Sequence, residues 1–292
     1  MFFVERVIAV IENQKYRDAV EKLGVRLRAQ GLEFLCPDMN NCSGLLSDES
    51  EKNSLRKSVE NTPVLWLTDN ASCATVLRKK GHAVLAYLHA DNRNQDFSAA
   101  GYACEEPQEL DAEYMDRVFR RYMRLPWDIL QTKRCFVRET VPEDAEAFYE
   151  IYGEPSVTRY MEGLSPDAEQ EKQYINDYID KIYSFYDCGI WTIIKDDTDE
   201  IIGRAGLTFR EGYEDPEIGF VIGVPWQGQG YAEEVCRAIL EYGRTELGFT
   251  TVQAFVRPEN QASLSLCKKL GFETVGEVML EKAVHRRLVR RL

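Results

Sequence analysis

The segment 217–232 joins an apolar strand to an amphipathic helix, expected over 231–247, through a turn that contains Gly228 and Gly230. A glycine-containing turn at a helix N-terminus exposes successive main-chain N–H groups, and the helix dipole favours an anion there. The segment therefore predicts either a phosphate-binding loop or an ordinary strand-to-helix connection. It is not the dinucleotide-binding fingerprint, because Glu233 stands where that motif has its third glycine.

Apolar residues at strand and helix spacing surround this segment from Cys135 to the C-terminus. They predict an α/β domain over 135–292. The expected strands are 136–138, 190–194, 201–209, 218–224, 251–256, 272–280 and 284–289, and the expected helices are 143–152, 167–186, 231–247 and 261–270.

Two motifs in this domain carry a family resemblance. Gln227-Gly228-Gln229-Gly230-Tyr231-Ala232 resembles the Q/R-x-x-G-x-G/A signature of the GNAT superfamily of N-acetyltransferases. The stretch from Asn260 to Phe272 resembles the N-x-x-[AS]…Y…G-F segment of the same superfamily. The variants Glu217-Ile-Gly-Phe220 and Asn260-x-x-Ser263 resemble the RimJ/RimL-like branch, which acetylates protein N-termini and, in relatives, small amines. The resemblance covers residues 135–292 and implies a mixed sheet with flanking helices.

The resemblance also implies acetyl transfer from acetyl-CoA to a primary amine by direct attack, without a metal ion. The residues implied to bind the pyrophosphate are Gln227, Gly228, Gln229, Gly230, Tyr231 and Ala232. The strand before this loop is expected to separate from its neighbour, so that main-chain groups of Val221 and Ile222 hold the pantetheine arm and the thioester carbonyl. A main-chain N–H directed at that carbonyl would stabilise the oxyanion. Asn260 is implied to bind CoA or to orient the amine.

The reaction needs a base for the amine, and the leaving thiolate can be protonated by an acid. Glu217 matches a position that relatives often use for the base; the alternative is a solvated glutamate at a strand edge. Many relatives have a tyrosine as the acid where this chain has Cys267. Cys267 is therefore either the acid or a small buried apolar residue, and Ser263 is either the acid or a capping serine. The thiolate could also leave without help from the protein.

The distribution of charged residues along the chain and the position of Pro126 indicate a domain boundary. Residues 1–124 predict a smaller, Rossmann-like α/β domain, followed by a linker over 125–134. Residues up to 134 hold 20 acidic and 19 basic side chains, a net charge of -1, whereas residues 135–292 hold 29 and 17, a net charge of -12.

The first domain carries no clear catalytic motif. Residues 5–30 predict a helix, and a strand over 64–67, a helix that ends at Gly81 and a strand over 83–88 predict a parallel crossover. The pattern faintly resembles a haloacid-dehalogenase-type half, but the D-x-D-x-T nucleophile motif is absent. Asp69 is either a functional carboxylate or part of a helix cap. We expect this domain to be catalytically inactive and to act in acceptor choice, dimerisation or regulation, so a homodimer stays an open expectation.

The whole chain has a net charge of -13, which argues against a partner that is a nucleic-acid backbone. No apolar run approaches the roughly 20 residues of a membrane helix. Eight scattered cysteines without an export signal predict free thiols and a cytoplasmic protein. The three histidines lack zinc-binding spacing, so no metal site is expected.

The charge of residues 135–292 favours a cationic acceptor such as a polyamine, an aminoglycoside or a protein amine. Two other functions remain open. One is an acyl-CoA-binding sensor without transfer activity, and the other is a bifunctional protein whose first domain is hydrolase-like.

Overall fold

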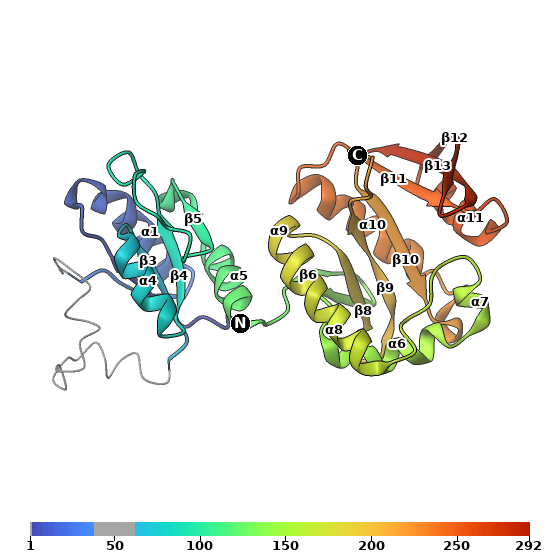
Figure 1. Cartoon of the computed structure of the whole chain (residues 1–292), viewed down its shortest axis with the longest axis horizontal. Helices are drawn as coiled ribbons and strands as arrows, with labels where there is room; N and C mark the ends of the chain where they lie inside the picture. The colour runs from blue at the N-terminus through green and yellow to red at the C-terminus, as the bar shows by residue number, and fades with distance from the viewer. Residues whose placement is uncertain (1, 38–61) are drawn as a thin grey trace. The chain divides into compact units, whose positions relative to one another are not determined.

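The computed structural model describes residues 2–37 and 62–292 (Figure 1). Its contacts divide the chain into two compact units, Met1–Leu125 and Pro126–Leu292. Each unit has its own sheet and its own buried apolar clusters, so each is described by itself.

The first unit is built on a five-stranded sheet of parallel strands in the order β2-β1-β3-β4-β5, as a Rossmann-like domain would have. Helices α1 and α5 cover one face of the sheet and α4 covers the other, so every residue of β3 and β4 is buried. The elements are β1 (Arg6–Val10), η1 (Gln14–Tyr16), α1 (Arg17–Ala29), β2 (Glu33–Leu35), β3 (Val64–Thr68), α4 (Ala71–Lys79), β4 (Ala83–Tyr87), β5 (Tyr102–Cys104), η2 (Pro107–Glu109) and α5 (Ala112–Met123).

The prediction of one helix over 5–30 is wrong in its first part, because Arg6–Val10 forms strand β1 and α1 begins only at Arg17. Alternate residues of β1 pack into the two different clusters on either side of the sheet. A short run that is apolar on both faces has no periodicity that separates a strand from a helix.

The predicted parallel unit of β3, α4 and β4 is confirmed. Asn70 caps α4, since its side-chain oxygen accepts the Cys73 N–H (2.8 Å). Asp69 has another role: its carboxylate accepts the N–H groups of Glu12 (2.8 Å) and Asn13 (3.0 Å). Asp69 therefore fixes the loop that follows β1.

The second unit is built on an eight-stranded mixed sheet in the order β12-β13-β11-β10-β9-β8-β7-β6, in which β10 and β11 are the parallel pair. The expected mixed sheet with flanking helices is confirmed. The elements are β6 (Asp128–Gln131), β7 (Cys135–Arg138), η3 (Pro142–Asp144), α6 (Ala145–Tyr152), α7 (Pro155–Thr158), α8 (Ala168–Tyr178), η4 (Ile179–Tyr183), α9 (Ser184–Tyr186), β8 (Ile190–Lys195), β9 (Ile201–Thr208), β10 (Glu217–Ile222), η5 (Val224–Trp226), α10 (Tyr231–Thr245), β11 (Thr251–Val256), α11 (Gln261–Lys269), β12 (Glu273–Leu280) and β13 (Ala283–Arg291).

The two faces of this sheet are covered by different helices. Ile218 of β10 belongs to the large cluster that contains the apolar face of α10. Val221, of opposite parity on the same strand, packs against Ile151 of α6. The odd-numbered residues of β10, including Glu217, therefore lie on the α6 side of the sheet.

Two segments differ from the expected pattern. The expected linker 125–134 contains β6, which pairs with β7 as the edge of the second sheet. The expected helix 167–186 is not uniform, because α8 passes into a π-helical turn, η4, before α9. That turn carries Tyr183, which is fully buried and donates a hydrogen bond to the Ile190 carbonyl (2.5 Å).

Free thiols occur at Cys36, Cys104, Cys135, Cys188, Cys236 and Cys267. Cys73 is disulfide-bonded, which corrects the expectation of free thiols at that position, because a count of cysteines cannot show which side chains meet. Cys42 lies outside the described residues. Within residues 2–37 and 62–292, every helix is too short or too polar to cross a bilayer.

Candidate active site

Strands β10 and β11 are neighbours in the second sheet but separate almost at once. β10 pairs with β9 at six positions, from Glu217 to Ile222, whereas in the described structure its pairing with β11 joins Glu217 to Gln253 alone. At that point the Gln253 amide donates to the Pro216 carbonyl (2.9 Å). Towards their carboxyl ends the two strands no longer pair. The sheet therefore has an internal split that opens towards the loop after β10.

The pleat of β10 decides which main-chain groups face this split. The Gly223 amide donates to the Ile202 carbonyl of β9 (2.9 Å), and alternate residues of an antiparallel strand bond to the same neighbour. The main-chain groups of Val221 therefore face β9, while those of Phe220 and Ile222 face the split. Of the two residues expected to hold the pantetheine arm, Ile222 therefore presents its main chain to the split and Val221 presents its main chain to β9. The sequence alone does not show this difference, because the strand pairing sets the register.

The loop 223–230 is held in shape by its own glutamines. Gln227 donates from Nε2 to the Ile222 carbonyl (2.8 Å), and Gln229 donates from Nε2 to the Pro225 carbonyl (2.8 Å). Both side chains thus stabilise the loop by binding its main chain.

Helix α10 begins directly after this loop. Gly228 (φ 72°) and Gly230 (φ 84°) lie in the left-handed region that suits glycine. Gly230 is the N-cap residue, and no side chain caps the helix there. The N–H groups of Tyr231 and Ala232 in the first turn therefore have no capping side chain, and this helix N-terminus favours an anion. Tyr231 is only 5% exposed, and its side chain belongs to the large apolar cluster of the second unit.

Arg134, which the sequence analysis did not single out, reaches the same loop. Its Nη1 donates to the Gln229 carbonyl (3.1 Å), its Nε donates to Glu234 (2.7 Å), and its guanidinium lies 4.1 Å from the Tyr231 ring centroid. The hydrogen bond to Glu234 raises the pKa of Arg134. Arg134 is 95 positions from Gln229 in the chain, so no local pattern points to the contact.

Glu217 lies at the closed end of the split, and Arg210 holds its carboxylate. Arg210 donates from Nε to Oε2 (2.7 Å) and from Nη2 to Oε1 (3.5 Å), and the Glu217 side chain is 15% exposed. Arg210 also bonds Glu281, in the turn between β12 and β13 (3.2 Å), and the bond to Glu217 raises the pKa of Arg210. Glu217 is therefore a half-buried, ion-paired carboxylate rather than a solvated strand-edge residue.

Asn260, Ser263 and Cys267 lie at the start and along one side of α11, which follows β11. The Asn260 side chain caps the helix by accepting the Ser263 N–H (3.1 Å). Ser263 is half-buried. Cys267 is fully buried in the core, and this burial raises its pKa to about 11. The structure thus brings the residues expected to bind the donor to the segments that follow β10 and β11, and it places Cys267 in the core.

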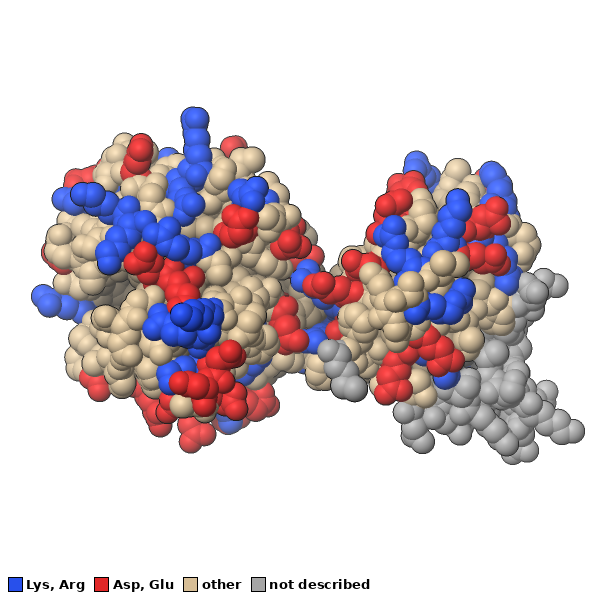
Figure 2. All heavy atoms as spheres, turned by 180° about the vertical axis from the view of Figure 1, so that it is seen from behind, with Lys and Arg blue, Asp and Glu red and all other residues tan. Residues whose placement is uncertain are grey.

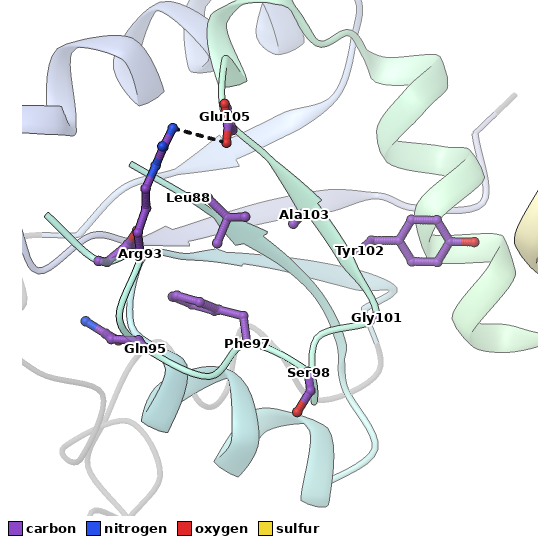
Figure 3. Close-up of a pocket in the computed structure, with 10 residues that line it drawn as sticks. Leu88, Arg93, Gln95, Phe97, Ser98, Gly101, Tyr102, Ala103 and Glu105 are labelled. Atoms are coloured by element: carbon purple, nitrogen blue, oxygen red, sulfur yellow. Dashed lines mark ion pairs between the residues drawn. The ribbon is translucent and has the colours of Figure 1, made fainter. Parts of the chain in front are cut away.

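The first unit has a separate hollow of about 620 Å³ beside β4 and β5 (Figure 3). Arg93 and Glu105 form an ion pair there (3.6 Å), with both side chains largely exposed, and Phe97 and Leu88 line the same hollow. Asp69 is buried and bonded to main-chain N–H groups. Across the described parts of both units, no three His, Cys, Asp or Glu side chains gather where they could hold a metal ion.

Comparisons with known proteins match the second unit. The family described as "Acetyltransferase (GNAT) domain" matches residues 134–273. The uncharacterised N-acetyltransferase p20 of Bacillus licheniformis is 31% identical over 152 residues, which are 51% of this chain and 84% of the relative. The uncharacterised N-acetyltransferase YoaA of Bacillus subtilis (strain 168) is 35% identical over 153 residues, with the same two shares. The [ribosomal protein uS5]-alanine N-acetyltransferase of Escherichia coli (strain K12) is 26% identical over 159 residues, 50% of this chain and 79% of the relative.

A solved structure shows the same fold at lower identity. It is that of RimL, a ribosomal L7/L12 alpha-N-protein acetyltransferase, with a TM-score of 0.51 and 14% identity, covering 57% of this chain and 96% of the other. The split strands, the glycine loop and the uncapped helix lie in the matched region. The chain therefore belongs to the GNAT family of N-acetyltransferases, with relatives among the acetyltransferases of ribosomal proteins.

Proposed function

We propose that the second unit transfers an acetyl group from acetyl-CoA to a primary amine by direct attack. The observation that carries the proposal is the single β10–β11 pairing at Glu217, followed by a split that leads to an uncapped helix N-terminus. A split inside a sheet leaves main-chain donors and acceptors without a strand partner, and an extended amide-containing chain can satisfy them. The pantetheine arm of CoA is such a chain.

Two groups of residues would hold acetyl-CoA. The loop 227–230 and the first turn of α10 (Tyr231 and Ala232) would bind the pyrophosphate through main-chain N–H groups. Phe220 and Ile222 would bind the pantetheine arm. Asn260 would act mainly by fixing the start of α11, since its side chain already caps that helix. When bound, acetyl-CoA supplies an activated acyl group.

Glu217 and Ser263 would move the protons. Glu217, on the α6 side of the closed end, would accept the proton of the attacking amine directly or through water, after Arg210 shifts away from one carboxylate oxygen. A main-chain N–H that faces the split would stabilise the negative charge that develops on the carbonyl oxygen. Ser263, half-buried on α11, is placed better than the buried Cys267 to protonate a leaving thiolate.

The acceptor would be a small-molecule amine or a protein N-terminus. Named relatives act on ribosomal protein uS5, and one is a spermidine N(1)-acetyltransferase that matches over 65 residues. A homodimer remains compatible with either acceptor.

The test is direct. Isothermal titration calorimetry of the full chain with acetyl-CoA should show binding, and Gly230→Val should abolish it, because valine is strained at a φ of 84°. Gly248→Val is the control, since Gly248 also has a positive φ (69°) but follows the C-terminal end of α10, at the opposite end of that helix from the loop. Equal acetyl-CoA affinity in wild type and Gly230→Val would refute the assignment of the loop.

A second measurement concerns the transfer itself. Thiol release should be measured with peptides, polyamines, aminoglycosides and amino acids as acceptors. Acetyl-CoA binding without thiol release for every acceptor would favour an acyl-CoA sensor over an enzyme.

A further inference from the structure

We propose that Arg134 is a specificity residue for the donor, which holds the pyrophosphate loop and offers its remaining guanidinium nitrogen to a phosphate of CoA. This inference rests on the proposed function of the second unit. Arg134 lies between β6 and β7, outside both sequence motifs.

Three contacts fix the position of the Arg134 side chain. Its Nε and its main-chain N–H donate to the two carboxylate oxygens of Glu234 (2.7 and 2.9 Å), and its Nη1 donates to the Gln229 carbonyl (3.1 Å). The guanidinium plane lies against the Tyr231 ring, with 4.1 Å between the guanidinium carbon and the ring centroid. One side chain thus connects the loop to the first two turns of α10.

The remaining nitrogen, Nη2, lies above the helix N-terminus. A Cβ atom built on Gly230 would be 3.6 Å from Nη2. The Arg134 side chain is 38% exposed. A phosphate that bound the uncapped N–H groups of α10 would lie within reach of Nη2, and guanidinium geometry suits phosphate oxygens.

The local charge favours such a contribution. No lysine or arginine occurs from residue 211 to residue 236, while Glu233 and Glu234 stand in the first turns of α10. Glu233 is paired with Arg237 and Lys269, and Glu234 with Arg134. The loop therefore has no cationic side chain of its own, and Arg134 brings one to it from a different part of the sequence.

The experiment compares donors that differ in their phosphates. Calorimetry with the full chain would use acetyl-CoA, its 3′-dephospho analogue and S-acetylpantetheine, which lacks both the pyrophosphate and the 3′-phosphate. Arg134→Gln should raise the Kd of acetyl-CoA about tenfold or more, as expected for a lost charge-assisted hydrogen bond. It should leave the Kd of S-acetylpantetheine unchanged.

Two further variants separate the possible causes. Lys133→Gln removes the same charge from the neighbouring exposed residue and should not change any Kd. Arg134→Lys keeps the charge but loses the fork geometry, so it should recover only part of the affinity. Far-ultraviolet circular dichroism and thermal melting check that each variant is folded.

The outcomes are distinct. If Arg134→Gln also weakens binding of the 3′-dephospho donor, the result supports a contact with the pyrophosphate. If Arg134→Gln weakens binding of acetyl-CoA but not of the 3′-dephospho donor, the result supports a contact with the 3′-phosphate. Both results keep the inference. An equal loss for all three donors would overturn it, because Arg134 would then act on the fold alone. If the wild type binds none of the donors, the proposed function itself is refuted.

Discussion

Glu217 and Arg210 form the charged pair at the closed end of the split between β10 and β11. The pair is half-buried, and Arg210 also holds Glu281 on the β12–β13 turn. A carboxylate that is fixed in this way is oriented in advance for a reacting amine. Arg210 bonds both carboxylate oxygens of Glu217, so movement of Arg210 is part of the proposed reaction.

Glu217→Gln should lower kcat/KM by about 100-fold or more, because an amide cannot accept the proton of the amine. The Kd of acetyl-CoA should not change. Glu214→Gln is the matched control: Glu214 is exposed, lies in the segment just before β10 and carries the same charge. Steady-state kinetics with the best acceptor measure both variants, and equal rates for the two would remove Glu217 as the base.

Cys267 is a buried thiol whose pKa is raised to about 11 by the surrounding core. It therefore stays protonated at neutral pH. Cys267→Ala should leave kcat and its pH profile unchanged and lower the stability by about 1 kcal/mol through a small cavity. A large loss of kcat in a folded variant would restore Cys267 as the acid, and Ser263→Ala gives the parallel test for Ser263.

The raised pKa of Cys267 also makes the stability of the protein depend on pH. The folded state holds the thiol proton more tightly than the unfolded chain does. The resulting contribution to the free energy of unfolding is fully present at pH values below the ordinary pKa of a thiol. It is lost as the pH rises towards 11. Thermal melting from neutral to alkaline pH should show a smaller decline for Cys267→Ala than for wild type.

At the residue scale, the sequence predicted the glycine loop well, because a local turn with positive-φ glycines needs no distant partner. It did not show that the main chain of Val221 faces β9 while that of Phe220 faces the split, since the pleat depends on pairing with β9. Arg134 and Arg210 were missed for the same reason. Their partners Gln229 and Glu281 lie far away in the chain and meet them only in the folded sheet.

At the scale of elements, the sequence predicted most of the second sheet, where strands alternate with well-terminated helices. The failures are β1 and β6. β1 is apolar on both faces, so its pattern does not differ from that of a short helix. β6 is a four-residue edge strand that follows a proline, and the composition of that stretch resembles a linker. Both strands are defined by their partners rather than by their own residues.

Gly206 illustrates how closely β8 and β9 approach. A Cβ atom at Gly206 would lie 1.8 Å from the Gly189 carbonyl oxygen, which is main chain and cannot rotate away. Gly206→Ala should therefore destabilise the protein by about 3 kcal/mol or more, as backbone displacement in a core requires. Gly276→Ala in β12 is the control, because nothing lies within 4 Å of its Cβ position. Urea denaturation measures both, and equal midpoints would contradict the close approach.

At the scale of the whole molecule, the two units have separate cores. The clusters of the first unit draw on residues up to Phe119 and those of the second on residues from Trp127 onwards. Figure 2 shows that charge is also unevenly distributed over the second unit, at the left of the view, with basic side chains gathered in its upper part and acidic ones along its lower rim. The net charge of -12 over residues 135–292 is thus not a uniform acidic field.

The fragment 126–292 should fold alone and bind acetyl-CoA with the affinity of the full chain, because every residue proposed to bind it lies in this unit. Calorimetry and thermal melting compare the fragment with the full chain. The proposed role of the first unit in acceptor choice predicts a change in KM for the acceptor with the donor affinity unchanged. A fragment that melts without cooperativity would contradict the separation of the two cores.

The split between β10 and β11 has a consequence for hydrogen exchange. Amides in the interior of a wide sheet normally exchange slowly with deuterium, because neighbouring strands protect them. Here the Phe220 and Ile222 amides face no strand, whereas the Val221 amide between them faces β9. Exchange along β10 should therefore alternate between fast and slow from one residue to the next, and a bound donor should slow only the fast positions.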